Sequence, residues 1–408
     1  MTDMSSAMST TPAFPMERAA ECPFDPPAEL ARLRDSDRIV QAACPAGIDA
    51  WVVTRYEDVR TMLKDPRFSS HKAPSSHATP GVDLTKEVSP GSLLQLDGEA
   101  HAKLRRAVIA EFTVRRIEQM RPYIQRIIDE HIDAMLAGPK PVDLWTEFAL
   151  PIPSLVICEL LGVPYEDRHE FHEWSAVLMA IDNDPGTRFA TYGRLQQYMA
   201  ELFEGKAAEP GEDLISRLIV RGRESGEPLP IPILVDIATT LLIAGHETTA
   251  NQIALSTIAL LQHPEQVDRL RAEPSLAPSA VEEMLRYISL VQWGLLRHAT
   301  EDIDLGNEKI RAGDWVVASL AAGNRDDRFF DDPETIDLGR TTNRHLAFGF
   351  GIHQCLGQQL ARVELQEAFV RLFTRIPTLR LAVGLEELEF KHNTLVYGVR
   401  KLPVTWET

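Results

Sequence analysis

Apolar residues recur along much of the chain at the three- and four-residue spacing of helices that bury one face. One such face, with Pro122 near its start and Gly138-Pro139 at its end, comprises Ile124, Ile127, Ile128, Ile132 and Met135. A second face, closer to the C-terminal end, comprises Ala361, Leu365, Ala368, Phe369 and Leu372. The segment 232–261 is apolar almost all round, which indicates a helix buried on every side.

Strand-like patterns are few and short. They are Ile39–Ala42, Trp51–Thr54, Trp315–Leu320 and Thr394–Tyr397. We therefore predict a mainly α protein with a small β portion. No internal repeat or long linker divides the chain, so we expect one large domain over residues 17–408. Residues 1–16, rich in Met, Ser, Thr and Ala, are expected to form a disordered tail.

Composition narrows the class of protein. Apolar residues make up 44% of the 408 residues and charged residues 25%, which allows a large core and disfavours wholesale disorder. The net charge of -18 disfavours nucleic acid or an anionic membrane as a general partner. The apolar run Ile237–Ala244 is too short to span a membrane, and no secretory signal is visible. Four scattered cysteines favour a reducing compartment, so a soluble cytoplasmic protein is expected.

One cysteine lies in a dense motif, Phe348-Gly349-Phe350-Gly351-Ile352-His353-Gln354-Cys355-Leu356-Gly357, directly before a predicted helix. A thiolate at the start of a helix is favoured by the helix dipole and by free N–H groups. Other interpretations exist. A lone cysteine is usually a small buried apolar residue, and a nucleophile with distant His and Asn partners stays open. Zinc needs about four ligands, and no second cysteine or paired histidine lies nearby.

The predicted central helix contains Ala244-Gly245-His246-Glu247-Thr248-Thr249. An acid and a hydroxyl in an apolar helix are costly to bury without partners. In a structural interpretation the threonine bonds back to the preceding turn and Glu247 pairs with a core His or Arg. In a functional one, Glu247 and Thr248 handle protons while Gly245 leaves room for a ligand. The motif alone does not decide between the structural and the functional interpretation.

The pattern Phe-x-x-Gly-x-His-x-Cys-x-Gly resembles the haem-binding loop of the cytochrome P450 monooxygenases. The Ala-Gly-x-Glu-Thr motif, a Glu-x-x-Arg pair at Glu283 and Arg286, and the segment Phe330-Asp331-Asp332-Pro333 follow in the family's order. The resemblance spans about residues 20 to 400. It implies the cytochrome P450 fold, with haem b between the long central helix and the helix after the Cys loop. Cys355 would be the axial ligand of the iron.

The resemblance also implies roles for individual residues. Thr248 would hydrogen-bond to oxygen at the iron and Glu247 would supply protons through water. Arg340 would join Glu283 and Arg286 in a structural cluster that supports the Cys loop. The other residues expected to contact haem are Ala244 and Gly245 on the distal side, His101, Arg105, Arg297 and His353 at the two propionates, and Phe348 and Gly357 in the loop. The N–H groups of residues 356–358 are expected to point at the sulfur.

The substrate pocket is sketched by analogy with the same family. Its expected lining residues are Leu94, Leu178, Ile181, Leu241, Val291, Leu295 and Val396. These side chains are apolar, so we expect hydroxylation of a hydrophobic small molecule with one oxygen atom of O2. The Pro-, Gly- and Ser-rich loop from Pro74 to Gly91 is expected to form a mobile entrance.

No flavin- or nicotinamide-binding domain fits in the remaining sequence. By resemblance to the soluble bacterial members, electrons would pass from NAD(P)H through a ferredoxin reductase and a ferredoxin to a monomeric enzyme. The arginines expected to form a basic docking surface are Arg105, Arg106, Arg115, Arg116, Arg344 and Arg362. The rival hypotheses are a peroxide-driven haem-thiolate peroxygenase and a non-enzymatic haem sensor. The pair Glu247 and Thr248 argues against the peroxygenase.

Overall fold

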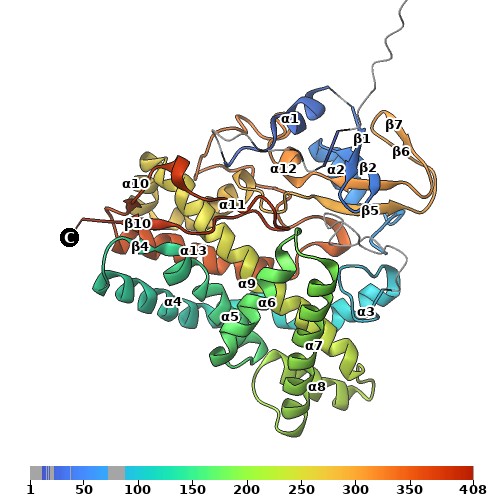
Figure 1. Ribbon diagram of the computed structural model, residues 1–408, viewed down its shortest axis with the longest axis horizontal. Helices are drawn as coiled ribbons and strands as arrows, with labels where there is room; N and C mark the ends of the chain where they lie inside the picture. The colour runs from blue at the N-terminus through green and yellow to red at the C-terminus, as the bar shows by residue number, and fades with distance from the viewer. Residues whose placement is uncertain are drawn as a thin grey trace, which may run out of the picture.

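The long helix α9 (Ile231–Leu261) runs through the middle of the molecule, and α5, α7 and α13 pack against it (Figure 1). The structure is a computed structural model that describes residues 12–14, 16, 18, 23–36, 38–71 and 88–407. Its other helices are α1 (Ala28–Asp35), α2 (Tyr56–Lys64), α3 (Gly98–Ile109), α4 (Val114–Ala137), α5 (Pro151–Leu161), α6 (Arg168–Met179), α7 (Pro185–Ala208), α8 (Leu214–Ser225), α10 (Pro264–Ala272), α11 (Ala277–Tyr287), α12 (Leu320–Gly323) and α13 (Gln358–Arg375).

The strands form three small sheets. They are β1 (Val40–Cys44), β2 (Ile48–Val53), β3 (Phe68–Ser69), β4 (Val142–Asp143), β5 (Leu295–Ala299), β6 (Ile303–Leu305), β7 (Glu308–Ile310), β8 (Trp315–Ala318), β9 (Arg380–Leu381) and β10 (Pro403–Thr405). The largest sheet has the order β1-β2-β8-β5-β3, in which only β2 and β8 are parallel. The smaller sheets are β4-β10-β9 and the hairpin β6-β7.

The elements gather into two regions (Figure 1). The five-stranded sheet lies with α1, α2 and α12 in the upper right of the view, and the remaining helices occupy the left and lower parts. One extensive apolar core surrounds α9, and two smaller ones lie around the sheet. The mainly α fold with a small β portion is confirmed. The expected single domain over residues 17–408 remains a prediction.

The apolar patterns located the main helices well. Helix α9 begins within one residue of the predicted segment, and the residues predicted for the face of α13 are buried apart from Ala361, which is half-buried. By length and composition α9 could also cross a membrane, as can the core helix of a soluble protein. Because it lies among other helices of this fold, we interpret it as a core helix.

The predicted start of one helix is wrong. Pro122 lies inside α4, which begins eight residues earlier at Val114. Proline removes one helical hydrogen bond. The helix nevertheless continues because Ile117 extends the buried face, and Arg121 forms an ion pair with Glu367 on α13. Tertiary packing therefore outweighs the local effect of Pro122.

One predicted strand is also wrong. Three of the four strand-like runs correspond to β1, β2 and β8, but Thr394–Tyr397 forms only an isolated bridge between Thr394 and Ala180. Its N–H groups bond to separate segments: Leu395 donates to Met179 O at 2.8 Å and Tyr397 to Leu290 O at 2.9 Å. The run is extended and apolar, but no single neighbouring strand follows it.

Most of the predicted N-terminal tail lies outside the described residues. Within it, residues 12–14 lie against β1, where Phe14 N donates to Ala43 O at 2.9 Å and the Phe14 ring is buried. This end of the segment is therefore packed on the protein, in contrast to the prediction.

Glu364 on α13 is a buried acid with an unusual environment. Its side chain is only 1% exposed, and Oε2 has no hydrogen-bond partner among the described residues. Burial raises the pKa of Glu364 well above its usual range. The folded protein therefore holds a proton here that the unfolded chain releases as the pH rises above the normal carboxyl pKa.

We expect Glu364→Gln to stabilise the fold increasingly with pH. Between the unfolded and folded pKa of Glu364, the wild type loses about 1.4 kcal/mol per pH unit relative to a neutral side chain. Thermal unfolding of both proteins at about pH 5.5 and about pH 8 measures this difference. A gap in melting temperature that does not widen at the higher pH would contradict the assignment.

Candidate functional site around Cys355

The loop before α13 folds tightly because its glycines adopt conformations that other residues avoid. Gly349 and Gly351 have φ angles of 68° and 78°. A Cβ on Gly351 would lie 2.3 Å from the carbonyl oxygen of Leu63. The N–H of Cys355 donates to Phe348 O at 2.9 Å, which closes the loop. These features fix the position of the cysteine at the start of α13.

The Cys355 thiol lies in a mixed electrostatic environment. Burial raises its pKa, while the N–H groups of Gly357 and Gln358 and the charges of Arg105 and Arg362 lower it. The expected approach of the Leu356 N–H group to the sulfur stays a prediction. Cys355 is solvent-accessible although protein surrounds the thiol, so we infer that the sulfur borders an internal space. On balance the pKa of Cys355 is raised, so the thiol form is favoured without a ligand, and the two N–H groups and the two arginines offset part of the cost of a thiolate here.

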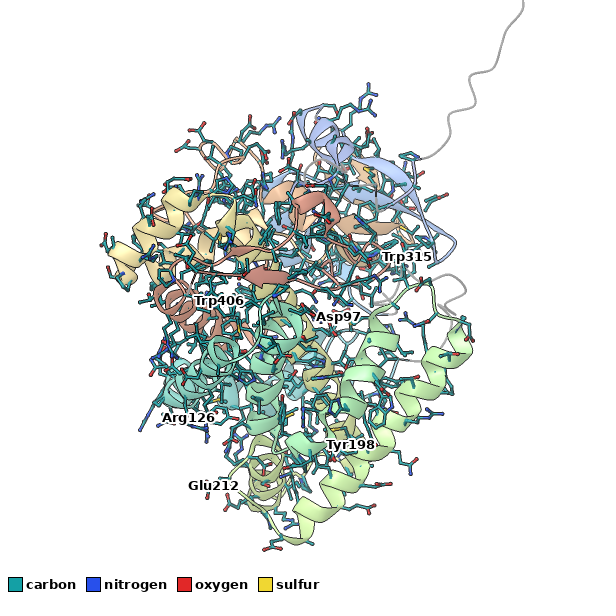
Figure 2. All side chains as sticks on the ribbon, turned by 60° about the vertical axis from the view of Figure 1, so that its left-hand side comes forward. Asp97, Arg126, Tyr198, Glu212, Trp315 and Trp406 are labelled. Atoms are coloured by element: carbon teal, nitrogen blue, oxygen red, sulfur yellow. The ribbon has the colours of Figure 1, made fainter. Side chains whose placement is uncertain are left out.

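Two of the predicted propionate-binding residues form a histidine pair beside Asp97. The ring centroids of His101 and His353 lie 4.2 Å apart, and His353 Nε2 is 3.1 Å from Asp97 Oδ1. Burial alone would raise the pKa of Asp97, but hydrogen bonds from His353, Ser69 and the N–H of His71 lower it to about 2. Asp97 is labelled near the centre of the view in Figure 2.

Burial and the nearby positive charges lower the pKa of His101 to about 4, so this ring is neutral at pH 7. Its Nε2 atom is buried and has no hydrogen-bond partner among the described residues. A buried polar atom without a partner is costly, and a bound ligand would satisfy it.

The two predicted arginines also lack ion-pair partners among the described residues. Arg105 donates to Gln354 O at 2.7 Å and Arg297 to Leu296 O at 2.7 Å, and among the described residues neither forms an ion pair. Burial lowers the pKa of Arg297 to about 10. Buried cations are stable only with compensating charge. The site therefore fits a ligand that carries two carboxylates, as haem does.

A bare metal site is not supported. Among the described residues, no group of three or more His, Cys, Asp or Glu side chains is arranged to hold an ion. The single thiol of Cys355, beside unpartnered cations, instead suits a metal that arrives within an anionic cofactor.

On α9, Ala244 is exposed although the helix runs through the core, so this turn also borders an open space. Thr248 Oγ1 donates to Ala244 O at 2.9 Å, which is the back-bond of the structural interpretation. The expectation that Gly245 leaves room for a ligand stays a prediction, and the structure shows a packing role for this glycine as well. A Cβ at Gly245 would lie 2.7 Å from Ile157 on α5, so the glycine allows close packing of two helices.

Glu247 is buried and has partners, although not those of the structural interpretation. Asn251 Nδ2 donates to Glu247 Oε2 at 3.1 Å, and Lys391 Nζ lies 3.9 Å from the same oxygen. The partner is therefore a lysine from the C-terminal part of the chain, not a His or Arg. Asn251 lies at the i+4 position, so helical spacing could have identified it. No pattern in the sequence around Lys391 predicted its contact with Glu247.

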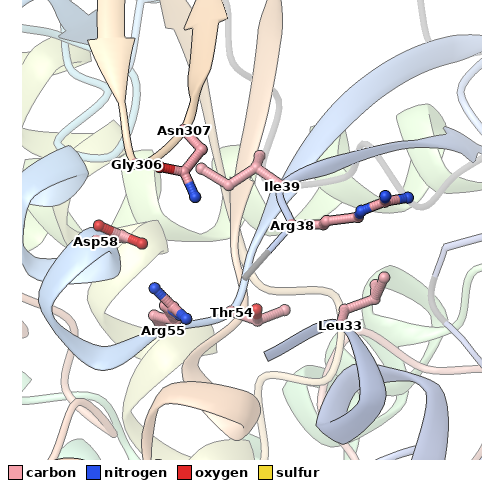
Figure 3. A pocket seen from close by; sticks show the side chains of 8 residues that line it. All are labelled: Leu33, Arg38, Ile39, Thr54, Arg55, Asp58, Gly306 and Asn307. Carbon is pink, nitrogen blue, oxygen red and sulfur yellow. The ribbon is translucent and has the colours of Figure 1, made fainter. Parts of the chain in front are cut away.

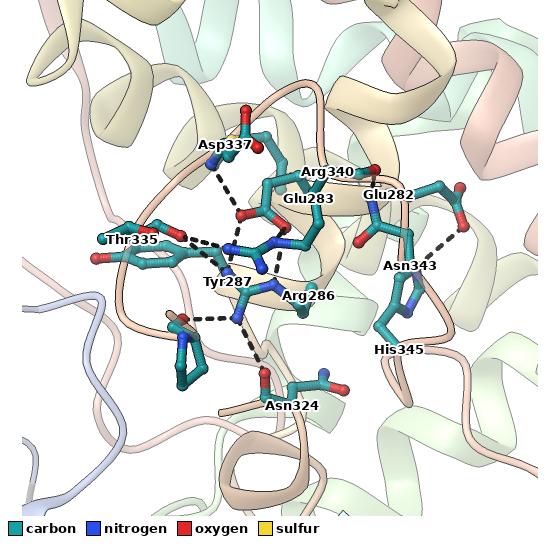
Figure 4. Close-up of polar contacts among 12 residues, drawn as sticks. Glu282, Glu283, Arg286, Tyr287, Asn324, Thr335, Asp337, Arg340, Asn343 and His345 are labelled. Carbon is teal, nitrogen blue, oxygen red and sulfur yellow. Dashed lines mark hydrogen bonds and ion pairs between the residues drawn. The ribbon is translucent and has the colours of Figure 1, made fainter. Parts of the chain in front are cut away.

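The three residues predicted to form a structural cluster meet in the core (Figure 4). Glu283 and Arg286 are fully buried and joined by two hydrogen bonds of 2.8 Å, and Arg340 Nε donates to Glu283 Oε2 at 3.0 Å. Arg286 also donates to the carbonyl oxygens of Asn324, Pro333 and Thr335. The cluster thus binds α11 to the segment that leads into the Cys loop.

The predicted pocket walls are partly brought together. The segments 178–181, 290–295 and 394–397 are joined by backbone hydrogen bonds, including Ile181 N to Asn393 O at 3.1 Å. Leu178 and Val396 are buried, and Ile181, Leu241, Val291 and Leu295 are half-buried. Leu295 also lies beside the Cys loop, because a Cβ on Gly349 would be 3.3 Å from its Cδ1.

The structure does not join Leu94 to these segments. Its side chain is 53% exposed, and most of the predicted entrance loop before it, residues 72–87, lies outside the described residues. The described end of that loop contacts α9 instead, where Ser89 Oγ donates to Asp236. A groove of about 530 Å³ lies here between α7 and α9.

A more enclosed pocket of about 120 Å³ lies elsewhere (Figure 3). Its lining residues come from α1, α2, the segments before β1 and after β2, and the β6-β7 turn: Leu33, Arg38, Ile39, Thr54, Arg55, Asp58, Gly306 and Asn307. None of them belongs to the site around Cys355, and the volume is too small for a porphyrin. We assign it no part in the chemistry.

Comparison with known proteins agrees with this geometry. A family model described as Cytochrome P450 matches residues 194–376. The chain is 44% identical to cytochrome P450-SU2 of Streptomyces griseolus, covering 99% of this chain and 100% of that protein. It is 42% identical to the vitamin D3 dihydroxylase of Streptomyces griseolus, covering 100% of each. The crystal structure of CYP105P1 in complex with filipin I superposes with a TM-score of 0.92 at 44% identity, covering 98% of this chain and 99% of that one.

The fold and the site define a haem-thiolate protein. The chain belongs to the cytochrome P450 family, and its full-length relatives are CYP105-type proteins of actinomycetes. It is a cytochrome P450 monooxygenase whose cofactor is haem. The family predicted from the Cys motif is thereby confirmed, and the nucleophilic-cysteine hypothesis is withdrawn; the assignment of Cys355 as the iron ligand stays a prediction.

Proposed function

We propose that this monooxygenase hydroxylates a hydrophobic small organic molecule with electrons delivered from NAD(P)H by a ferredoxin reductase and a ferredoxin. The observation that carries the proposal is the exposed Cys355 at the start of α13, with the half-buried apolar side chain of Leu295 beside its loop. Relatives include a vitamin D3 dihydroxylase and a protein crystallised with filipin I, which supports a largely apolar substrate.

Haem supplies the oxygen-activating chemistry when it is bound. The protein contributes the thiolate of Cys355 and a set of groups for the carboxylates. We propose that Arg105, Arg297 and the unpartnered Nε2 of His101 bind the two propionates. His353 would take part through its contact with Asp97, which orients the ring. We propose that the Phe348 ring packs against the Cys loop. The Arg362 guanidinium lies 4.7 Å from the centroid of this ring.

We propose that Thr248 and Glu247 would move protons into the space beside the exposed turn of α9, where the bound haem would supply the oxygen chemistry. The Thr248 hydroxyl lies on the exposed turn of α9, where its bond to Ala244 O fixes its position. Glu247 is the nearest acid along the same helix. Proton transfer by positioned groups of this kind contributes about 10²- to 10⁴-fold to a rate.

We expect Thr248→Ala to retain substrate binding and electron uptake but to form mainly peroxide. Product formed per NAD(P)H should fall by about tenfold or more, because proton delivery is lost while reduction continues. Product and peroxide are measured together in the reconstituted system. Thr257→Ala is a matched control, since Thr257 makes the same back-bond, to Ile253 O at 2.8 Å, farther along α9. Fully coupled turnover by Thr248→Ala would refute the proton-delivery role.

We propose a smaller ferredoxin-docking surface than the six arginines predicted from the sequence. Arg105 points at the Cys loop, Arg106 pairs with Glu99, Arg116 approaches Glu111 at 3.5 Å, and Arg362 pairs with Glu282, so Arg115 and Arg344 are the exposed members that form no ion pair among the described residues. We propose that Arg115 and Arg344 attract an acidic ferredoxin. Reduction should then slow with added salt, because steered association is screened.

A reconstituted electron chain tests the proposed function directly. Turnover with NAD(P)H, reductase and ferredoxin supports a monooxygenase of this type. Efficient turnover with peroxide alone and none with the electron chain would favour the peroxygenase. Binding of apolar molecules without any turnover would favour the haem sensor. We further propose a monomer in the cytoplasm, where the free cysteines Cys44, Cys158 and Cys355 would stay reduced.

A further inference from the structure

Lys391 lies against the proton-transfer helix although it is far from it in sequence. Its backbone N–H donates to Gly398 O at 2.7 Å, which folds the segment 391–398 back on itself. Its ammonium group lies 3.7 Å from the ring centroid of Trp145 and 3.5 Å from Asn251 Oδ1. The ammonium is thus held by an aromatic face and an amide, and is directed at α9.

The same lysine and asparagine surround one oxygen of Glu247. Asn251 Nδ2 donates to Oε2 at 3.1 Å, and Lys391 Nζ lies 3.9 Å from it. The Lys391 and Glu247 side chains are only 16% and 11% exposed, so their attraction is weakly screened. The distance of 3.9 Å is too long for a hydrogen bond. Lys391 therefore restrains the carboxylate electrostatically without a direct hydrogen bond.

The backbone is also shaped for this contact. A Cβ on Gly398 would lie 1.6 Å from Asn251 Oδ1, so only glycine lets the C-terminal segment approach α9 here. Burial lowers the pKa of Lys391, while Glu247 raises it and Arg400 lowers it further. The other titratable group that Glu247 influences is the buried His246 on α9.

We propose that Lys391 is a positioning residue that holds Glu247 in the orientation from which it delivers protons. The proposal rests on the proton-transfer role proposed for Glu247. It assigns to the C-terminal segment a part in how oxygen reduction is coupled to product formation. Lys391 acts through its contacts with Glu247 and Asn251.

The first test asks whether the contact exists in solution. Lys391→Met should lower the melting temperature, because it leaves a buried carboxylate without its counter-charge. Adding Glu247→Gln should restore part of the loss, since the double variant has no unpaired charge. Lys401→Met, which removes an exposed lysine from the same segment, is the matched control. Additive losses in the double variant would contradict the contact.

The second test measures the ratio of product to peroxide in the reconstituted system. Lys391→Met should lower product per NAD(P)H by roughly tenfold, as loss of an outer partner of a reacting group commonly does. The carbon monoxide spectrum and the substrate-induced spectral shift should stay as in wild type. Lys391→Arg should recover much of the coupling because it keeps the charge.

The double variant distinguishes failure of the positioning role of Lys391 from failure of the proton-transfer role of Glu247. If Lys391 acts through Glu247, Lys391→Met/Glu247→Gln should be no less coupled than Glu247→Gln alone. A further loss in the double variant, or full coupling in Lys391→Met beside an uncoupled Glu247→Gln, would overturn the positioning role. Full coupling in Glu247→Gln would instead refute the proton-transfer role on which the proposal rests.

Discussion

Cys355→Ser is expected to reduce monooxygenation to background while the fold persists. A serine hydroxyl cannot supply the electron density that a thiolate gives to the iron for O–O cleavage. The substitution changes one atom in a loop whose shape depends on its glycines and on the bond from residue 355 N to Phe348 O. Turnover and haem content per chain are measured after supplementation with haem.

Cys158→Ser is the control for this prediction. Cys158 is buried, and burial and the charge of Asp167 raise the pKa of its thiol to about 12, whereas backbone N–H groups and arginines offset part of the rise at Cys355. This variant should keep the activity and spectrum of the wild type, apart from any loss of stability. Monooxygenation that survives in Cys355→Ser and is lost in Cys158→Ser would contradict the assignment of the ligand.

Arg286→Met is expected to cause the largest loss of stability. Arg286 is fully buried, is joined to Glu283 by two hydrogen bonds, and donates to three carbonyl oxygens. Its removal leaves Glu283 buried with only part of its counter-charge, from Arg340. Breaking a buried pair in this way costs about 3–5 kcal/mol. The segment that leads to Cys355 would loosen, and haem would be lost at lower denaturant concentration.

Arg269→Met provides the comparison for Arg286→Met. Arg269 pairs with Asp337 at 3.1 Å, but both side chains are nearly half exposed. A pair of this kind contributes about 0–1 kcal/mol. Denaturant midpoints followed by haem absorbance measure both variants. Equal, small shifts for Arg269→Met and Arg286→Met would show that the buried cluster does not hold the loop.

The sequence predicted those parts of the fold that depend on local pattern. Helix α9 is apolar all round and α13 on one face, and burial of these surfaces determines their positions. The start of α4 was missed because Pro122 is a strong local signal that tertiary packing overrides. The run 394–397 was misassigned because an apolar extended segment becomes a strand only where a neighbouring strand lies beside it.

The residues of the site also fall into two groups: those that local motifs predicted and those that depend on contacts between distant parts of the chain. Cys355, the arginines and the histidines were found because they lie in motifs that resemble a family. Asp97 and Lys391 were missed because their partners, His353 and Glu247, are 256 and 144 residues away along the chain, and no local spacing records such contacts. The close packing of α5 on α9 at Gly245 was not predicted, since it depends on Ile157, a residue far from this glycine in the sequence.

The most direct test of the central claim is the carbon monoxide difference spectrum of the reduced, haem-loaded wild-type protein. If the Cys355 thiolate is the axial ligand, the thiolate-type band should dominate the spectrum and should disappear in Cys355→Ser. A spectrum of the imidazole-ligated type in the wild type, or a thiolate-type band that persists in Cys355→Ser, would contradict the account.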